Sequence, residues 1–225
     1  MKDKTEGVRV GAGMLATLIV TLALAACGGS ATTSPHTQSA SSSAPKSAPS
    51  STPAEVASLD GPVLANPAPV PPLALHNYLG QPVNLADYRG RAVLLTFIYT
   101  HCPDVCPIIV ANLHNALALL GRNASKVQIV AVSTDPRGDT HAAIAGFLAR
   151  REMTGRMQYL VGTRSQLTPV WRAWGISASK PTAKDEVAHS AVVYGITAGG
   201  MVKVAYPANF TPAMIAHDVP LLAGS

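Results

Sequence analysis

The chain has 225 residues, of which 13% are charged and 5% are aromatic, and its formal net charge at pH 7 is +5. The basic residues are scattered along the chain and no nucleic-acid-binding motif is present. Nucleic acid is therefore excluded as an expected partner, and the charge is interpreted as a solvated surface.

The first 27 residues have the layout of an export signal. Lys2, Lys4 and Arg9 precede an apolar stretch over residues 10–26, and small residues lead up to Cys27. The segment Leu-Ala-Ala-Cys resembles the bacterial lipoprotein box, which implies that Cys27 becomes the lipidated first residue of the mature chain. An ordinary signal peptide or an uncleaved anchor is the alternative. In each case we expect the rest of the chain on the extracytoplasmic face of the cell membrane.

Residues 28–61 are expected to form a disordered tether. They are dominated by Ser, Ala, Thr and Pro, and such a segment cannot bury enough apolar surface to offset the entropy lost on ordering. A flexible coil of this length reaches about 30 to 35 Å, enough to lift a domain off a membrane. Residues 62–225 then have the size of one domain.

From residue 62 onward the hydrophobic pattern alternates between strands and helices. Continuous apolar runs predict strands buried on both faces at 92–99 and 127–132, and a short strand is predicted at 157–161. Apolar residues at helical spacing predict helices at 108–120, 141–151, 166–174 and 212–222. Residues 191–197 and 201–206 are expected to form a hairpin. This order predicts an α/β fold whose central sheet has an antiparallel edge, preceded by an N-terminal hairpin.

The segment YTHCPDVCP, residues 99–107, places Cys102 and Cys106 just after the first buried strand, where open α/β sheets carry their sites. Pro107 suits the first position of a helix, which would make Cys106 its N-cap. The positive end of the helix dipole lowers a thiol pKa, so we expect a reactive pair. A permanent disulfide is the alternative, although so short a loop would stabilise the fold little.

Two cysteines alone do not distinguish a redox centre from a metal site, because a metal needs a further ligand. If Cys27 is lipidated, no other cysteine remains in the folded domain, so that ligand must be His or Met. His189 stands out among the histidines because it follows a polar segment, residues 177–186, and directly precedes a predicted strand. His101 adjoins the pair and could tune it.

Several motifs, in this order and spacing, resemble the Sco/SenC family of copper proteins. They are LGQPVNLADYRGR (79–91), YTHCPDVCP (99–107), STDPRGDT (133–140) and VAHSAVVY (187–194). The resemblance implies a thioredoxin-like fold with a copper site formed by Cys102, Cys106 and His189. It also implies a role at the binuclear copper centre of cytochrome c oxidase, either delivering copper or keeping that centre reduced.

Other positions of the family motifs are less clear. The family commonly has an acidic residue where this chain has Ala188, and Asp185 or Glu186 could take its place. Asp135 and Asp139 match the family's D-P-x-x-D-T turn. We expect Asp135 to order that turn and Asp139 to cap the helix that follows.

The donor set agrees with copper on chemical grounds. Two thiolates and one imidazole form a soft site of low coordination number, whereas structural zinc prefers four protein ligands. The competing function is a thiol-disulfide reductase, in which Cys102 and Cys106 exchange electrons with a partner and His189 tunes a pKa. Peroxide reduction has no support beyond a shared fold. We expect the cysteine half of the site to be preformed and the histidine half to be ordered by metal.

Overall fold

The computed structural model describes residues 58–176 and 191–225. Its strands, in chain order, are β1 (Val63–Pro69), β2 (Ala74–Asn77), β3 (Pro82–Asn84), β4 (Ala92–Ile98), β5 (Val127–Ser133), β6 (Met157–Val161), β7 (Val192–Ile196) and β8 (Met201–Pro207). They form one eight-stranded sheet in the order β1-β8-β7-β4-β5-β6-β2-β3.

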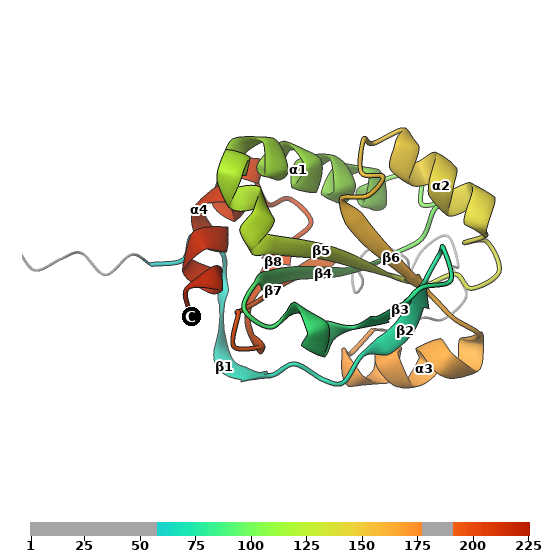
Figure 1. Ribbon diagram of the computed structural model, residues 1–225, viewed down its shortest axis with the longest axis horizontal. Coiled ribbons are helices and arrows are strands. Elements are labelled where there is room, and N and C mark those ends of the chain that lie inside the picture. The colour runs from blue at the N-terminus through green and yellow to red at the C-terminus, as the bar shows by residue number, and fades with distance from the viewer. Residues whose placement is uncertain (1–57, 177–190) are drawn as a thin grey trace, which may run out of the picture. The chain divides into compact units, whose positions relative to one another are not determined.

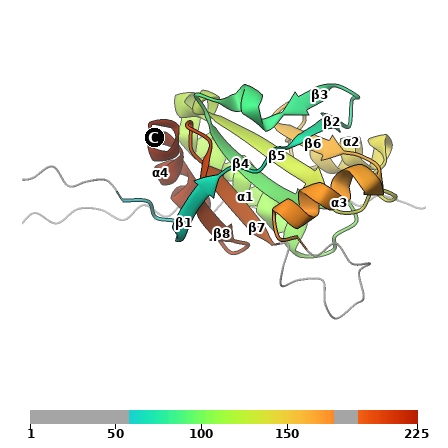
Figure 2. The ribbon, with the colours of Figure 1, turned by 90° about the horizontal axis from the view of Figure 1, so that it is seen from below.

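Helices cover both faces of this sheet (Figure 1). They are α1 (Val105–Leu120), α2 (His141–Ala149), α3 (Arg164–Ala173) and α4 (Pro212–Ala223), with 3-10 turns η1 (Leu85–Tyr88) and η2 (Gly121–Lys126). Figure 2 shows α3 on the opposite face from α1. The arrangement is the thioredoxin-like α/β fold that the resemblance implied, and the predicted helices and strands all occur within a few residues of their expected bounds.

The centre of the sheet is parallel because β4, β5 and β6 run in the same direction. All seven residues of β4 are buried, which explains why its sequence reads as a continuous apolar run rather than an alternating one. Each large apolar side chain buried here contributes about 1.5–3 kcal/mol. The carboxyl ends of the three strands lie at one edge of the sheet, and this edge carries the loops described below.

The margins of the sheet differ in part from the prediction. The 191–206 hairpin forms as β7 and β8. It does not contain the edge strand, however, because β1 pairs antiparallel with the outer side of β8. The sequence of β1, VLANPAP, gave no strand signal, since its prolines cannot donate to a ladder and are tolerated only in marginal strands. The expected N-terminal hairpin is confirmed as β2 and β3 on the opposite margin.

The helix α1 was expected to begin at residue 108 and begins three residues earlier. Together with η2 it is long and apolar enough to cross a membrane by length and composition. However, Ile109, Val110 and Leu113 are completely buried in the same core cluster as residues of β4 and β5. We therefore interpret α1 as a core helix of the sheet.

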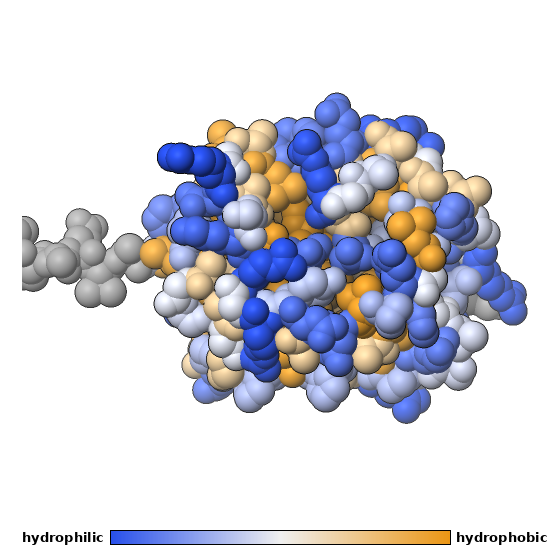
Figure 3. All heavy atoms as spheres, viewed as in Figure 1, coloured by the Kyte–Doolittle hydropathy of each residue, from blue (hydrophilic) through white to orange (hydrophobic). Residues whose placement is uncertain are grey.

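The surface has a mixed character. In the view of Figure 3, hydrophilic side chains are spread over the face and apolar ones form small groups between them. This agrees with the solvated surface expected from the scattered charges. Among the large apolar side chains that remain exposed, Ile108 is 54% exposed and lies two residues after Cys106.

Candidate functional site

Cys102 and Cys106 lie where the chain passes from the carboxyl end of β4 into α1. Neither forms a disulfide, and their exposed fractions are only 8% and 4%. The Cys106 backbone N–H donates a hydrogen bond of 3.3 Å to the Cys102 sulfur. The fold thus holds the two thiols together on one loop.

The prediction that Cys106 caps the helix is wrong. Asp104 is the N-cap, and Val105 is the first helical residue, so Cys106 and Pro107 fall at the second and third positions. A proline is tolerated there because N–H groups of the first helical turn have no partner within the helix. The Cys106 N–H is one of these groups. The Cys106 N–H is therefore free to donate a hydrogen bond to the sulfur of Cys102.

The two thiols differ in acidity because they form a hydrogen-bonded pair. Donation from the Cys106 thiol lowers the pKa of Cys102 to about 6, against the opposing effect of burial, and the backbone N–H groups of Cys106 and Asp104 add to the lowering. The same bond, together with burial, raises the pKa of Cys106. Near neutral pH the metal-free pair therefore holds one thiolate, on Cys102, and one thiol, on Cys106.

One cation interacts with this pair although no sequence motif pointed to it. Arg151 follows α2 and stacks on the Phe147 ring, with 4.0 Å between its guanidinium carbon and the ring centroid. Burial lowers its pKa, as does Arg150, while the charges of Cys106 and Cys102 act in the opposite direction. Arg151 was not identified from the sequence, because the residue is far from the cysteines along the chain and only the fold brings it near them.

Asp139 was expected to cap α2, and this prediction is wrong. Thr140 is the N-cap, and its hydroxyl accepts a 3.2 Å hydrogen bond from the Ala143 N–H. Asp139 instead points inward, is only 6% exposed, and accepts a 2.7 Å bond from the Thr100 N–H. The prediction failed because capping depends on which of two neighbouring polar residues faces the helix axis, and sequence alone does not decide this.

The expectation for Asp135 is confirmed. Its carboxylate accepts a 3.2 Å bond from the Arg137 N–H, and its carbonyl accepts a 2.9 Å bond from the Asp139 N–H. These bonds order the turn after β5. A side chain at Gly138 would collide with the Asp135 carboxylate and approach the His101 ring. The exposed His101 therefore packs beside this turn, and its Nδ1 lies 3.1 Å from the Thr100 hydroxyl.

The other residues singled out in the sequence are distributed as follows. His189 and Cys27 lie outside the described residues. Two further histidines lie on helices: His114 on α1 is partly buried, and His141 on α2 is exposed beside the Tyr78 ring. The structure therefore brings together Cys102 and Cys106 of the implied ligand set.

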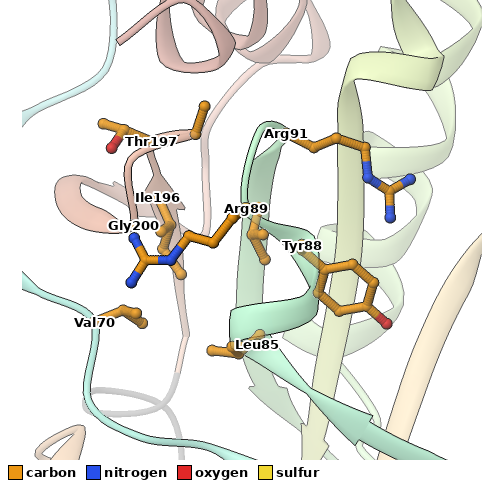
Figure 4. A pocket seen from close by; sticks show the side chains of 10 residues that line it. Val70, Leu85, Tyr88, Arg89, Arg91, Ile196, Thr197 and Gly200 are labelled. Carbon is orange, nitrogen blue, oxygen red and sulfur yellow. The ribbon is translucent and has the colours of Figure 1, made fainter.

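A small hollow lies at the other end of β4. Arg89 extends across it and donates a hydrogen bond to the Gly199 carbonyl, while Leu85, Ile196 and Val70 line its wall (Figure 4). The hollow is next to the residue that starts β4, whereas the cysteines follow the residue that ends it. It is therefore separate from the thiol pair.

Comparison with known families finds a match to the model described as SCO1/SenC over residues 65–223. The chain is 30% identical over 155 residues to the mitochondrial SCO1 homologue of Mus musculus, covering 66% of this chain and 54% of that protein. It thus spans about half the length of such curated relatives.

Solved structures agree with this match. ScoI of Bradyrhizobium japonicum, solved with copper bound, is 28% identical with a TM-score of 0.60, covering 69% of this chain and 99% of that one. A SCO1/SenC family lipoprotein of Bacillus anthracis is 25% identical with a TM-score of 0.60, covering 71% and 99%. The described fold is thus the fold of solved Sco proteins.

Proposed function

This chain belongs to the SCO1/SenC family, and on that premise we propose that it is a copper protein of cytochrome c oxidase assembly. Its ligands in this proposal are Cys102, Cys106 and His189. It acts on the extracytoplasmic face of the cell membrane, held by a lipid on Cys27, and it hands copper to the subunit that carries the binuclear copper centre.

The observation that carries the proposal is the state of the thiol pair. Cys102 and Cys106 are buried and hydrogen-bonded to each other, and the Cys106 thiol lowers the pKa of Cys102 to about 6. Soft thiolate ligands in a nearly dry pocket favour Cu(I) over harder cations. The donor set therefore fits copper, and two similar chains, from Bradyrhizobium japonicum and Arabidopsis thaliana, were solved with copper bound.

The described start of β7 supports His189 as the third ligand. Val192 lies three residues after His189, and its carbonyl accepts a 3.0 Å hydrogen bond from the Thr96 hydroxyl of β4. Thr96 lies close to the end of β4 from which the cysteine loop departs. The chain therefore returns from the His189 segment beside the strand that leads to Cys102.

The thiols have different tasks when copper arrives as cargo. Cys102 offers a thiolate at once, whereas Cys106 must release its proton, so loading releases about one proton near neutral pH. A site with three protein ligands leaves room for an incoming thiolate of the receiving subunit. Copper can then pass by ligand exchange without being released into water.

The membrane attachment rests on the first residues and on one relative. The Leu-Ala-Ala-Cys segment ends at Cys27, and the similar Bacillus anthracis chain is described as a lipoprotein. Residues 28–61 serve as the tether between the lipid and the folded domain. Mass spectrometry of the membrane-extracted protein should find a diacylated or triacylated Cys27 as the first residue, and an unlipidated mature chain that begins elsewhere would disprove it.

A second function, thiol-disulfide reductase, is favoured by the same low pKa of Cys102. Its thiolate would attack a partner disulfide, and Cys106 would then attack the Cys102 sulfur of the mixed disulfide. The partner leaves with two thiols, and the chain keeps a Cys102–Cys106 disulfide. Because that disulfide cannot bind Cu(I), copper loading and oxidation exclude each other.

Anaerobic titration of the full chain with Cu(I), against a chromophoric chelator, separates the two functions. The copper proposal expects one tightly bound Cu(I) per reduced chain, none in the oxidised chain, and transfer to a thiol-bearing acceptor. His189→Ala should weaken Cu(II) binding more than Cu(I) binding, because imidazole matters more to the harder ion. Tight copper binding that survives a Cys102→Ser, Cys106→Ser double substitution would refute the site.

A further inference from the structure

One buried carboxylate lies beneath the cysteine loop and connects it to the parallel strands. Asp139 accepts three hydrogen bonds, each from a different part of the fold. They come from the Thr100 N–H at 2.7 Å, the Ser133 hydroxyl at 2.6 Å and the Tyr159 hydroxyl at 2.9 Å. Bonds to an ionised acceptor at such distances are among the stronger ones in proteins.

The groups around Asp139 are themselves held in place. Tyr159 is completely buried, and its hydroxyl also lies 3.3 Å from the Ile98 carbonyl at the end of β4. The Ser133 carbonyl accepts a 3.0 Å bond from the indole N–H of Trp171 on α3. The carboxylate therefore joins the loop after β4, the end of β5 and the middle of β6, and through Ser133 the network reaches α3.

The Thr100 N–H is the link to the thiols, because Thr100 precedes Cys102 by two residues. A backbone bond within the loop, from the Cys102 N–H to the Tyr99 carbonyl, is 3.4 Å long and therefore weak. The bond from Thr100 to Asp139 is shorter and charge-assisted. Asp139 thus holds the segment from which Cys102 projects.

We propose that Asp139 is a positioning residue for the thiol pair: by holding the Thr100 N–H it fixes the loop geometry in which Cys102 and Cys106 bind copper. The inference rests on the proposed function, since it assigns Asp139 a part in the same site. Tyr159 supports this role by orienting the carboxylate. Asp139 does not itself touch the metal.

The molecule contains a matched control at its other end. Asp218 on α4 is completely buried and accepts a 2.9 Å bond from the hydroxyl of Tyr206, which is also completely buried. It accepts backbone N–H bonds as well, from Asp60 at 2.7 Å and Gly61 at 2.8 Å. This cluster repeats the chemistry of the Asp139 cluster, but its bonds go to the N-terminal segment of the domain.

The test compares Tyr159→Phe with Tyr206→Phe in the full chain. Each substitution removes one hydroxyl donor to a buried carboxylate, so both should destabilise the fold to a similar degree in urea. Cu(I) affinity, measured by chelator competition, should fall about tenfold in Tyr159→Phe, the size expected when support of a metal ligand is lost. It should stay unchanged in Tyr206→Phe. Equal copper affinities in the two variants would overturn the inference.

A second measurement needs no copper. The thiol–disulfide equilibrium of the chain with glutathione compares Asp139→Asn with Asp218→Asn. An amide in place of the Asp139 carboxylate holds the Thr100 N–H less firmly, so the loop that keeps the two sulfurs together becomes looser and the disulfide less favourable. Asp139→Asn should therefore shift the equilibrium toward the dithiol form, and Asp218→Asn should not. Identical equilibria in both variants would count against a role of Asp139 at the thiols.

The two measurements also separate failure of the inference from failure of the proposed function. If the wild-type chain binds no Cu(I), the copper function is wrong, and the glutathione equilibrium alone decides the positioning role. If the wild type binds Cu(I) and Tyr159→Phe binds it equally well, the function stands and the inference fails. If Asp139→Asn does not fold, the copper affinity of Tyr159→Phe still tests the inference.

Discussion

The two ends of the domain use the same device for different purposes. At the cysteine end, buried Asp139 holds a backbone N–H and two hydroxyls beneath a reactive loop. At the other end, buried Asp218 holds the Asp60 and Gly61 N–H groups and the Tyr206 hydroxyl. A buried carboxylate is costly unless its lone pairs are satisfied, and both are. The difference lies in what each one holds.

The Asp218 end holds the start of the domain. A side chain at Gly61 would collide with the Tyr206 ring and with Val204, so the N-terminal segment packs directly against β8. In Figure 1 this segment and α4 lie at the left, and the carboxyl ends of β4 and β5 lie at the right. The described chain therefore enters the domain at the end opposite the thiols.

Removing the thiols should abolish the chemical difference between the two ends. We expect Cys102→Ser or Cys106→Ser to eliminate tight Cu(I) binding, because one thiolate and one imidazole supply too few soft ligands. The chain should still fold, although a buried hydroxyl in place of a thiol lowers the free energy of unfolding by about 1–3 kcal/mol. Chelator competition measures the first effect and denaturant unfolding the second. Copper binding of wild-type affinity in either variant would argue for a different site.

Removing the carboxylate at the Asp218 end should affect stability alone. Asp218→Ala leaves the Asp60 and Gly61 N–H groups and the Tyr206 hydroxyl without their acceptor, which should lower the free energy of unfolding by about 3 kcal/mol. Cu(I) affinity of the folded fraction should be unchanged. Urea unfolding and copper competition on the same preparation check both statements. A parallel loss of copper affinity would mean that the two ends are coupled.

The acidity of Cys102 can be read from its rate of alkylation in the metal-free reduced chain. With its pKa lowered to about 6 by the Cys106 thiol, the rate with iodoacetamide should reach half its maximum near that pH. Cys106→Ala removes the donor, so the midpoint should move up toward the ordinary thiol value of about 8.5. Mass spectrometry locates the modified residue. An unmoved midpoint would show that the Cys106 thiol is not the cause.

The smallest effect is expected at His217, which lies 2.9 Å from an Asp218 oxygen and 3.5 Å from an Asp60 oxygen. The hydrogen bond to Asp218 raises the His217 pKa above its ordinary 6.5, and the charge of Asp60 adds to this. Protonation is thus favoured by folding. The resulting stability is fully present below pH 6.5 and is lost as the pH rises through the folded-state pKa.

A His217→Gln variant should therefore lose a modest part of its stability at mildly acidic pH and little at alkaline pH. The ring is exposed to solvent, which screens the pairing and keeps the effect small. Thermal unfolding of wild type and variant over a pH series measures the difference. A gap between the two that does not narrow as the pH rises would contradict the pairing. His141→Gln, at another exposed helical position, is the control.

Sequence patterns predicted the parts of this molecule that depend on local chemistry. The continuous apolar run of β4 and the spacing of Ile109 and Leu113 on α1 reflect burial that each element needs wherever it packs. Residues 99–107 likewise singled out Cys102 and Cys106 as a pair, because cysteine is scarce in this chain and each of the two precedes a proline. The pair was also correctly predicted to follow a buried strand, because the continuous apolar run before it identifies that strand.

What only the tertiary structure decided depends on contacts between distant segments. Asp139 looked like a helix cap beside Thr140, and only packing showed that it faces inward to Thr100 and Tyr159. The charge of Arg151 acts on the thiols because the fold brings the residue that follows α2 near them. The strand β1 forms despite its prolines because the outer side of β8 is available for pairing. A side chain's neighbours along the chain set its local propensity, whereas its partners in space set its role, and those partners exist only after folding.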